Sequence, residues 1–334
     1  MNILVTGGAG YIGSHTTLEL LKQGHSVTIL DHLQKDKQYI LDAVKKEAGE
    51  FELIKADLQD LNGLEAALDN KEFDAVIHFA ASIEVGLSTK KPVEFIDNNL
   101  VGSQNLLKVL LNNGVNNIVF SSSAAVYGTP EKSPVPETAP FNSENPYGLS
   151  KALTEEIIKC YAEFKGLNAV ALRYFNPAGS YNGIIGESHH PETHLIPKLL
   201  YALKNPGQEF TVMGTDYDTP DGTTIRDYIH IMDLAEAHIK SLEYLADHKG
   251  LSVFNVGSGS GSSIKEVIAA AEKVTGKKLE YKSGPRRTGD SARLVADITK
   301  IKSEMGWQPK YQLMEIMESA WAWEKIRNKE DYQF

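Results

Sequence analysis

The sequence predicts an α/β protein built on a doubly wound parallel sheet, with a smaller C-terminal lobe. The first observation is that apolar runs of strand length alternate with segments of helical periodicity. The expected strands are 26–31, 51–54, 75–79, 117–121 and 169–173, and the expected helices include 61–68, 93–111 and 147–164. Strands that are apolar throughout are buried on both faces, which is typical of a parallel sheet covered by helices.

The second observation is that the composition of the sequence and the length of its predicted elements change after Asn176. A long loop rich in Gly, His, Pro and Asn leads into shorter helix and strand signals separated by turns. We therefore expect a nucleotide-binding domain in residues 1–176 and a substrate lobe in residues 177–334, with a crevice between them as the site. Residues 224–246 are as regular as the first half, so we expect them to cross back to the first domain.

The third observation is a glycine cluster directly after the first apolar strand. Gly7 can adopt turn backbone angles that other residues rarely adopt. Gly10 lets a pyrophosphate approach the backbone, and Gly13 lets the next helix lie close to the strand. That helix begins at Tyr11 and Ile12, where free N–H groups and the helix dipole attract phosphate. Because the spacing is G-x-x-G-x-x-G, a plain tight turn is the alternative interpretation.

The ends of the following strands suggest how such a cofactor is recognised. Asp31 ends the second strand about twenty residues beyond the glycines, where a carboxylate accepts from a ribose 2′-OH and repels a 2′-phosphate. NAD is therefore preferred over NADP. Residues at two further strand ends are expected to join the site: Asp57 and Leu58 at the adenine, and Phe79, Ala80 and Ala81 at the pyrophosphate and nicotinamide ribose. The alternative for the two alanines is a compact turn.

The chemistry is expected at the end of the fifth strand, which Ser121 and Ser123 close. Tyr147 and Lys151 are four residues apart, so they share one face of a helix. A phenol titrates near pH ~10, and a nearby ammonium and a charged nicotinamide would lower that pKa. We expect Tyr147 to remove a substrate proton while Ser123 holds the oxygen. A surface Tyr and Lys without a role is the alternative.

Composition limits the remaining classes. The chain has 334 residues, of which 42% are apolar and 23% charged, as in an ordinary globular protein, and its net charge of −10 argues against nucleic-acid and acidic membrane surfaces. Cys160 is the single cysteine, which excludes an internal disulfide and a cysteine metal cluster; we expect a buried thiol and predict no metal site. A cytoplasmic location is expected, because the sequence shows no bilayer-spanning run and no signal peptide.

Several motifs carry a resemblance to a known family. Residues 6–13, the set Ser123, Tyr147 and Lys151, and residues 172–176 resemble the extended short-chain dehydrogenase/reductase superfamily. Within it, residues 10–15, 120–128 and 226–234 closely resemble the UDP-glucose 4-epimerase family, and the likeness runs nearly the whole length. It implies a Rossmann-like domain, a tightly held NAD, and inversion of C4 of a UDP-hexose through a 4-keto sugar.

The resemblance also implies further site residues and a partner. Asn98 and Tyr174, with Ser121, Tyr147 and Lys151, would contact NAD. Asn176 and Leu195 would line the sugar and diphosphate, Thr211, Val212 and Met213 the uracil, Arg226 and Arg287 the phosphates, Asp290 the ribose, and Leu294 the hexose, beside Ser123 and Tyr147. Surface ion pairs are the alternative for the two arginines. A homodimer on helices 93–111 and 147–164 is implied, although their apolar faces can also be read as core.

Three positions depart from the family pattern. Ile83 stands where many members have a lysine that contacts the cofactor, and His194 replaces a more usual asparagine. Leu294 stands where strict glucose/galactose enzymes have a bulky tyrosine. A smaller residue there resembles variants that admit N-acetylated sugars, so the breadth of substrates stays open.

Three competing functions remain at this stage. A sugar-nucleotide dehydratase would need acidic groups just after the serine strand, where this chain has Ala124 and Ala125. A net dehydrogenase or reductase would exchange its cofactor, whereas an epimerase retains it. A non-catalytic NAD-binding scaffold would have no use for Tyr147 and Lys151 together.

Overall fold

The computed structural model describes residues 1–33, 37–189, 191–287 and 289–327, and these form two compact units. The first unit comprises Met1–Gly128, Pro140–Tyr174 and Ala235–Phe254, and the second comprises Thr129–Ala139, Phe175–Leu234 and Asn255–Phe334. The assignment of a ligand to each part of the chain stays a prediction.

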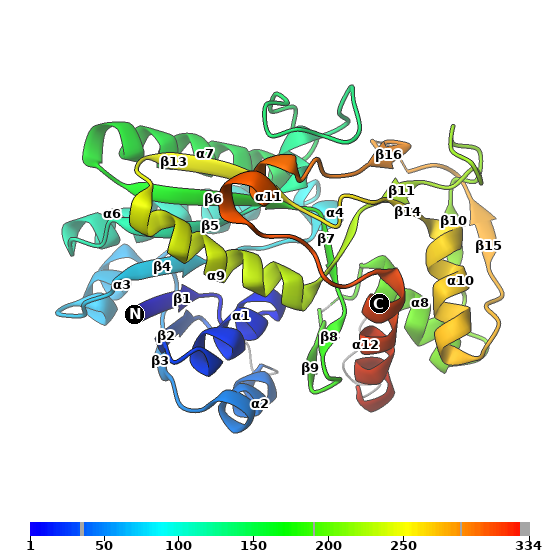
Figure 1. Cartoon of the computed structure of the whole chain (residues 1–334), viewed down its shortest axis with the longest axis horizontal. Coiled ribbons are helices and arrows are strands. Elements are labelled where there is room, and N and C mark those ends of the chain that lie inside the picture. Colours follow the sequence, from blue (N-terminus) through cyan, green and yellow to red (C-terminus); the bar gives the residue numbers. More distant parts are fainter. Residues whose placement is uncertain (34–36, 190, 288, 328–334) are drawn as a thin grey trace. The chain divides into compact units, whose positions relative to one another are not determined.

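A seven-stranded sheet forms the centre of the first unit (Figure 1). Its strands are β1 (Asn2–Thr6), β2 (Ser26–Asp31), β3 (Glu52–Lys55), β4 (Ala75–His78), β5 (Asn117–Ser123), β6 (Asn168–Tyr174) and β13 (Leu251–Val256). The order is β13-β6-β5-β4-β1-β2-β3, and the pairs from β1 to β6 are parallel. Strands β2 and β3 follow on one side of β1, and β4, β5 and β6 follow on its other side, so the doubly wound class is confirmed.

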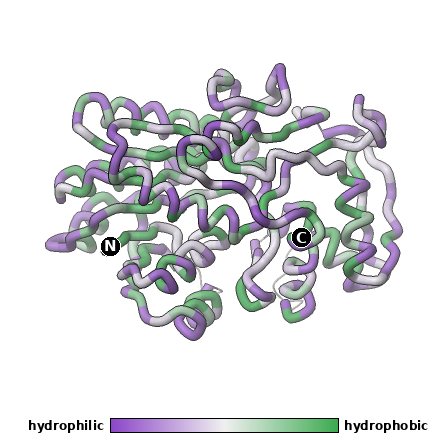
Figure 2. Tube along the Cα trace, viewed as in Figure 1, coloured by the Kyte–Doolittle hydropathy of each residue, from purple (hydrophilic) through white to green (hydrophobic). Residues whose placement is uncertain are grey.

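Helices flank this sheet, as the alternating sequence pattern predicts. They are α1 (Tyr11–Lys22), α2 (Gln38–Ala48), α3 (Leu61–Leu68), α4 (Val85–Ser88), α5 (Pro92–Ile96), α6 (Gly102–Asn112), α7 (Pro146–Lys165) and α9 (Ile231–Asp247). Leu64, Leu106 and Ile158, from α3, α6 and α7, pack with the sheet residues Val76 and Ile118 in one buried core. Hydrophobic colouring follows much of these strands in Figure 2, as expected for strands buried on both faces.

The expected single helix over residues 93–111 is interrupted. A π-helical turn at Asp97–Val101 separates α5 from α6, because hydrogen bonds there span five residues instead of four. Asn99 lies in this turn and is buried, where its side chain bonds to other buried groups. The prediction treated residues 93–111 as one helix because the residues on both sides of the turn have helical periodicity.

The prediction for Cys160 is wrong, because the thiol is exposed. Helix α7 buries a face that includes Lys151, Glu155 and Ile158. Cys160 follows Ile158 by two residues, about 200° around the helix, and therefore lies away from that face.

The second unit is built from short strands and four helices within its described residues. The strands are β7 (Asn176–Ala178), β8 (Ser180–Tyr181), β9 (Ile185–Gly186), β10 (Thr211–Met213), β11 (Ile225–Arg226), β12 (Tyr228–His230), β14 (Ser262–Ser263), β15 (Lys282–Gly284) and β16 (Arg293–Leu294). The helices are α8 (Leu195–Lys204), α10 (Ile264–Thr275), α11 (Thr299–Met305) and α12 (Leu313–Ile326). Leu199, Val267 and Ile316 join α8, α10 and α12 in one core.

No helix within the described ranges has the length and apolar character needed to cross a bilayer.

Candidate active site

The glycine turn after β1 has the close backbone approach that its sequence predicts. Gly7 has a φ of +71°, and a Cβ on it would lie 2.7 Å from the amide nitrogen of Ala80. A Cβ on Gly13 would collide with the carbonyl oxygen of Gly7, so α1 reaches this turn only because residue 13 has no side chain. Gly10 precedes Tyr11 and Ile12, whose amides open the helix. This arrangement suits the pyrophosphate of a dinucleotide.

Asp31 lies beside this turn at the end of β2. Its side chain is 8% exposed and accepts hydrogen bonds from the amides of Ala9 at 3.1 Å and Leu33 at 2.9 Å. Burial acts to raise the pKa of Asp31, but hydrogen bonds from His32 and these amides outweigh it and hold the pKa below its ordinary value. The carboxylate is therefore ionised at neutral pH, as recognition of a ribose diol requires.

Most of the other predicted cofactor residues lie at the same carboxyl edge of the sheet. Asp57 accepts from the Gln59 amide at 2.9 Å, and Leu58 is buried after β3. Phe79 and Ala80 follow β4, where their amides approach the carbonyl and the hydroxyl of Thr6, and Ala81 comes next in the chain. Carboxyl edges of parallel sheets are where ligands bind in such folds. Ile83, the departure from the family pattern, brings no charge here.

Asn99 organises this edge although only its neighbour Asn98 was expected to contribute. The Asn98 amide donates to the Ser82 hydroxyl at 3.1 Å. Asn99 accepts from the Ser82 amide at 2.8 Å and donates to the Ser82 carbonyl at 2.9 Å and to the Ser150 hydroxyl at 3.1 Å. It therefore ties the turn after β4 to helix α7. The sequence offered no clear signal for Asn99, because it directly follows two other polar residues, Asp97 and Asn98.

The serine strand, the tyrosine and the lysine come together as predicted. Helix α7 begins at Pro146, and the Asn145 side chain caps it by accepting from the Gly148 amide at 2.8 Å. Lys151 Nζ donates to the carbonyl oxygen of Ser121 at 2.7 Å, and the Ser121 hydroxyl bonds to the hydroxyl of Tyr174. The side chains of Lys151, Ser121 and Tyr174 are all buried.

The Ser123 hydroxyl lies close to the phenol of Tyr147 and favours its ionised form. Burial raises the pKa of Tyr147 above its ordinary value, and this outweighs the lowering effect of Ser123. In the chain without a cofactor, burial is therefore the dominant influence on this pKa, and the effect expected from Lys151 together with a charged nicotinamide stays a prediction. Burial lowers the pKa of Lys151 to about 7, so its ammonium is not assured at neutral pH, although the nearby Glu155 carboxylate opposes this shift.

The sequence did not predict the buried ion pair between Glu155 and Arg173. The Arg173 guanidinium donates to the Glu155 carboxylate through Nε at 3.0 Å and Nη2 at 2.6 Å, and through Nη1 to the Tyr127 hydroxyl at 3.0 Å. The Ser122 hydroxyl also donates to Glu155. Glu155 lies one helical turn after Lys151, a spacing visible in the sequence, but only the fold shows that Arg173 of β6 reaches it.

In the second unit, three predicted substrate residues lie together. Arg226 Nη2 donates to the Asp290 carboxylate at 2.9 Å, and Arg226 is the register partner of Leu294 where β11 pairs with β16. Arg226 is partly buried, unlike an ordinary surface ion pair. A guanidinium held by one carboxylate keeps further N–H groups that suit phosphate oxygens.

The remaining predicted substrate residues occupy separate parts of this unit. Asn176 donates to the Asp227 carbonyl at 2.8 Å, and Leu195 is the first residue of α8, directly after His194. Thr211, Val212 and Met213 form β10, whose partner strand is β15. The Arg287 carbonyl accepts from the Asp290 amide at 3.3 Å, and its side chain is exposed. Thr288, next in the chain, lies outside the described residues.

Comparison with known proteins gives a consistent family. Residues 4–320 match the model of the family described as GDP-mannose 4,6 dehydratase, which covers most of the chain. The chain is 44% identical over 330 residues to a UDP-glucose 4-epimerase of Rhizobium meliloti, covering 98% of both proteins. It is 46% identical to a UDP-glucose 4-epimerase of Halalkalibacterium halodurans, covering 97% of this chain and 96% of the relative.

The chain belongs to the UDP-glucose 4-epimerase family. A solved structure of the family member from Bifidobacterium longum, in complex with NAD+ and UDP, superposes with a TM-score of 0.92. It is 39% identical in sequence and covers 97% of this chain and 98% of that chain. The resemblance that the motifs predicted is therefore confirmed.

The buried Glu155–Arg173 pair generates a prediction about the stability of this epimerase fold. Glu155→Gln leaves the Arg173 charge buried against a neutral amide, and we expect the free energy of unfolding to fall by about 3–5 kcal/mol. Urea denaturation of the purified chain measures this. Glu156→Gln is the matched control, because Glu156 is exposed and pairs with Lys159 only at 4.0 Å; its loss should stay within about 0.5 kcal/mol. Equal unfolding midpoints for the two variants would contradict the structural role of the pair.

Proposed function

We propose that this chain inverts C4 of a UDP-hexose with NAD as its cofactor, interconverting UDP-glucose and UDP-galactose through a 4-keto sugar. The observation that carries the proposal is that Tyr147, Ser123 and Lys151 are buried together at the carboxyl end of β5, the sheet edge that also carries the glycine turn. The family to which the chain belongs, with its UDP-glucose 4-epimerases, supports the same reaction.

NAD fits the residues that the chain offers. Gly7, Gly10 and Gly13 leave the backbone of the turn accessible to a pyrophosphate, and the ionised Asp31 carboxylate suits the ribose hydroxyls while disfavouring a 2′-phosphate. When bound, NAD supplies a reversible hydride acceptor for the hexose carbon. Further contacts are proposed for the residues at the neighbouring strand ends: Asp57, Leu58, Phe79, Ala80, Ala81, Asn98, Ser121 and Tyr174.

Tyr147 moves the proton in this proposal. Its phenolate takes the proton of the C4 hydroxyl, and the resulting phenol returns it when C4 is reduced from the opposite face. Because burial raises the pKa of Tyr147, the phenolate needs stabilisation inside the site. The Ser123 hydroxyl supplies a hydrogen bond, and the Lys151 amine, held on the Ser121 carbonyl, supplies positive charge when it is protonated.

The second unit holds the nucleotide in this proposal. Arg226 and Arg287 bind the diphosphate, Asp290 the ribose hydroxyls, residues 211–213 the uracil, and Asn176 and Leu195 the diphosphate and sugar. The Arg226–Asp290 contact at 2.9 Å supports a preformed arrangement of two of these groups. Firm contacts to the nucleotide leave the hexose free to turn over between the two hydride transfers.

The competing functions fit the chain less well. A dehydratase needs an acid directly after Ser123, whereas Ala124 and Ala125 follow it. A net dehydrogenase needs an exchanging cofactor, so NAD retained through desalting separates it from an epimerase. A scaffold protein gives no reason to bury Tyr147 and Lys151 together at the end of β5.

Replacement of Tyr147 by phenylalanine tests the proton-transfer step. We expect turnover of UDP-glucose to fall about 10²–10⁴-fold while NAD stays bound, because only the acid–base group is lost. Coupled measurement of UDP-galactose formation and the absorbance of retained cofactor give the two readouts. Tyr161→Phe, on the same helix, serves as the control and should keep its activity. Turnover of Tyr147→Phe within a few-fold of the parent would remove Tyr147 from this role.

Substrate breadth depends on Leu294 in this proposal. UDP-glucose and UDP-N-acetylglucosamine are offered separately, and the 4-epimer formed from each is measured by chromatography. We expect UDP-glucose to be the better substrate, and Leu294→Tyr to lower any N-acetylglucosamine activity at least about tenfold, because a bulkier side chain fills the space of the acetyl group. A better kcat/KM for the N-acetylated sugar would make the alternative substrate class the main one.

A homodimer on α5 and α7 is part of the proposal. Val93 is 70% exposed, and Leu149 and Leu153 are 45% and 39% exposed, which is unusual for large apolar side chains on two helices in contact. Light scattering should give the mass of two chains, and Leu153→Glu should lower it toward one. Ile326→Glu, at another exposed apolar residue, is the control. A parent mass of one chain would exclude the dimer.

The expected cytoplasmic location and a role linking glucose and galactose metabolism stay predictions, which cell fractionation and growth on galactose would check.

A further inference from the structure

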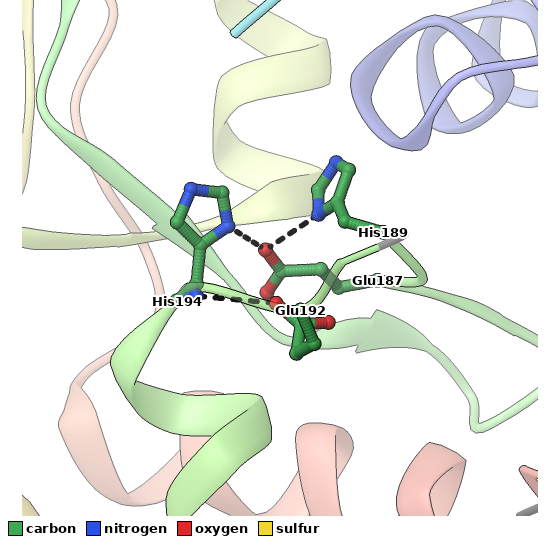
Figure 3. Close-up of side chains that lie close together, drawn as sticks. All are labelled: Glu187, His189, Glu192 and His194. Atoms are coloured by element: carbon green, nitrogen blue, oxygen red, sulfur yellow. Dashed lines mark hydrogen bonds and ion pairs between the residues drawn. The ribbon is translucent and has the colours of Figure 1, made fainter. Parts of the chain in front are cut away.

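A cluster of four potential metal ligands lies in the loop between β9 and α8. Its members are Glu187, His189, Glu192 and His194, and one ligand atom from each lies within 4.8 Å of the others (Figure 3). The set has two imidazoles and two carboxylates, the donor types that divalent transition ions take in proteins. Sequence reasoning missed it because only His194 was considered, as a neighbour of the substrate site.

Both carboxylates are buried, and both residues contact the segment that forms and follows α12. Glu187 is 5% exposed, and its backbone carbonyl accepts from Trp323 Nε1 at 2.8 Å. Glu192 is 2% exposed, and its carboxylate accepts from Arg327 Nη1 at 3.2 Å. The backbone of Glu187 and the carboxylate of Glu192 are therefore held by contacts outside the cluster, which supports a preformed ligand set.

Both imidazole rings approach the same carboxylate. His189 Nδ1 lies 3.3 Å from Glu187 Oε1, and His194 Nδ1 contacts the same oxygen. The two ring centroids are 5.1 Å apart. Two histidine nitrogens therefore converge on one buried carboxylate, where a divalent ion can accept lone pairs from both rings and from the carboxylate.

The separations are close to those of a coordination sphere. Ligand bonds of about 2.1 Å place neighbouring donors about 3.4 Å apart in a tetrahedral site and opposite donors about 4.2 Å apart in an octahedral one. The longest separation in the cluster, at most 4.8 Å, therefore has to shorten when an ion binds. The His194 side chain is 47% exposed.

We propose that Glu187, His189, Glu192 and His194 bind one divalent first-row transition ion, of the zinc type, which joins the loop after β9 to the start of α8. The ion is structural in this proposal, because both elements it joins lie in the second unit and none of its four ligands is among the residues assigned to proton transfer. The site does not depend on the proposed epimerase reaction, so either proposal can fail without the other.

Zinc titration of the full chain, first dialysed against a chelator, tests the site. We expect one Zn²⁺ per chain in competition with a chromophoric chelator, a higher melting temperature with Zn²⁺, and a visible absorption band when Co²⁺ replaces Zn²⁺. His189→Asn and His194→Asn should each weaken zinc binding at least about 100-fold, because each removes a direct ligand. His248→Asn is the matched control, since His248 is an exposed histidine stacked on Tyr244, and it should bind zinc like the parent.

Failure of the parent to bind Zn²⁺ would overturn the proposal regardless of how the variants fold. Unchanged affinity in both His189→Asn and His194→Asn would also overturn it, because the metal would then bind elsewhere. Circular dichroism of each variant without metal establishes that its fold is intact, and the Co²⁺ spectrum of the parent reports coordination directly even if one variant does not fold.

Discussion

The hydrogen bond from Lys151 to the carbonyl oxygen of Ser121 is the contact on which the arrangement of the site depends. At 2.7 Å it joins helix α7 to the end of β5, and the amine also lies 5.0 Å from the centre of the Phe120 ring. A buried amine without an acceptor would be costly, so helix and strand are held in one relative position. Tyr147, one helical turn earlier, then meets Ser123.

This placement has an electrostatic consequence. The burial that fixes Lys151 also lowers its pKa to about 7, while burial raises the pKa of Tyr147. Both shifts favour the uncharged forms of the pair. In the chain without a ligand, the proton therefore stays on the Tyr147 phenol. A ligand that brings positive charge close to Tyr147 lowers the pKa of the phenol and favours the phenolate. Spacing in the sequence showed that the two residues share a helix face, but not how deeply they are buried.

Much of the first unit was predictable from sequence because its signals are local. The predicted helix 61–68 coincides with α3, and the glycines of the first turn occupy the close contacts their spacing indicates. The fifth strand extends two residues beyond the prediction and brings Ser123 into the sheet. What escaped prediction is contact between distant segments: Arg173 on Glu155, or Arg327 on Glu192. Neither partner can be chosen from a sequence without the fold.

The π-helical turn at Asp97–Val101 divides the surface of its helical segment into two. An extra residue per turn rotates everything after it by about 100° relative to regular winding. Residues four apart across the turn therefore no longer lie above one another, and α5 and α6 direct their apolar stripes differently. Val93 on one side is largely exposed while Leu106 on the other is enclosed. An insertion or deletion within this turn would rotate the apolar face of α6 relative to that of α5. The segment therefore tolerates substitutions at its surface more readily than a change in its length.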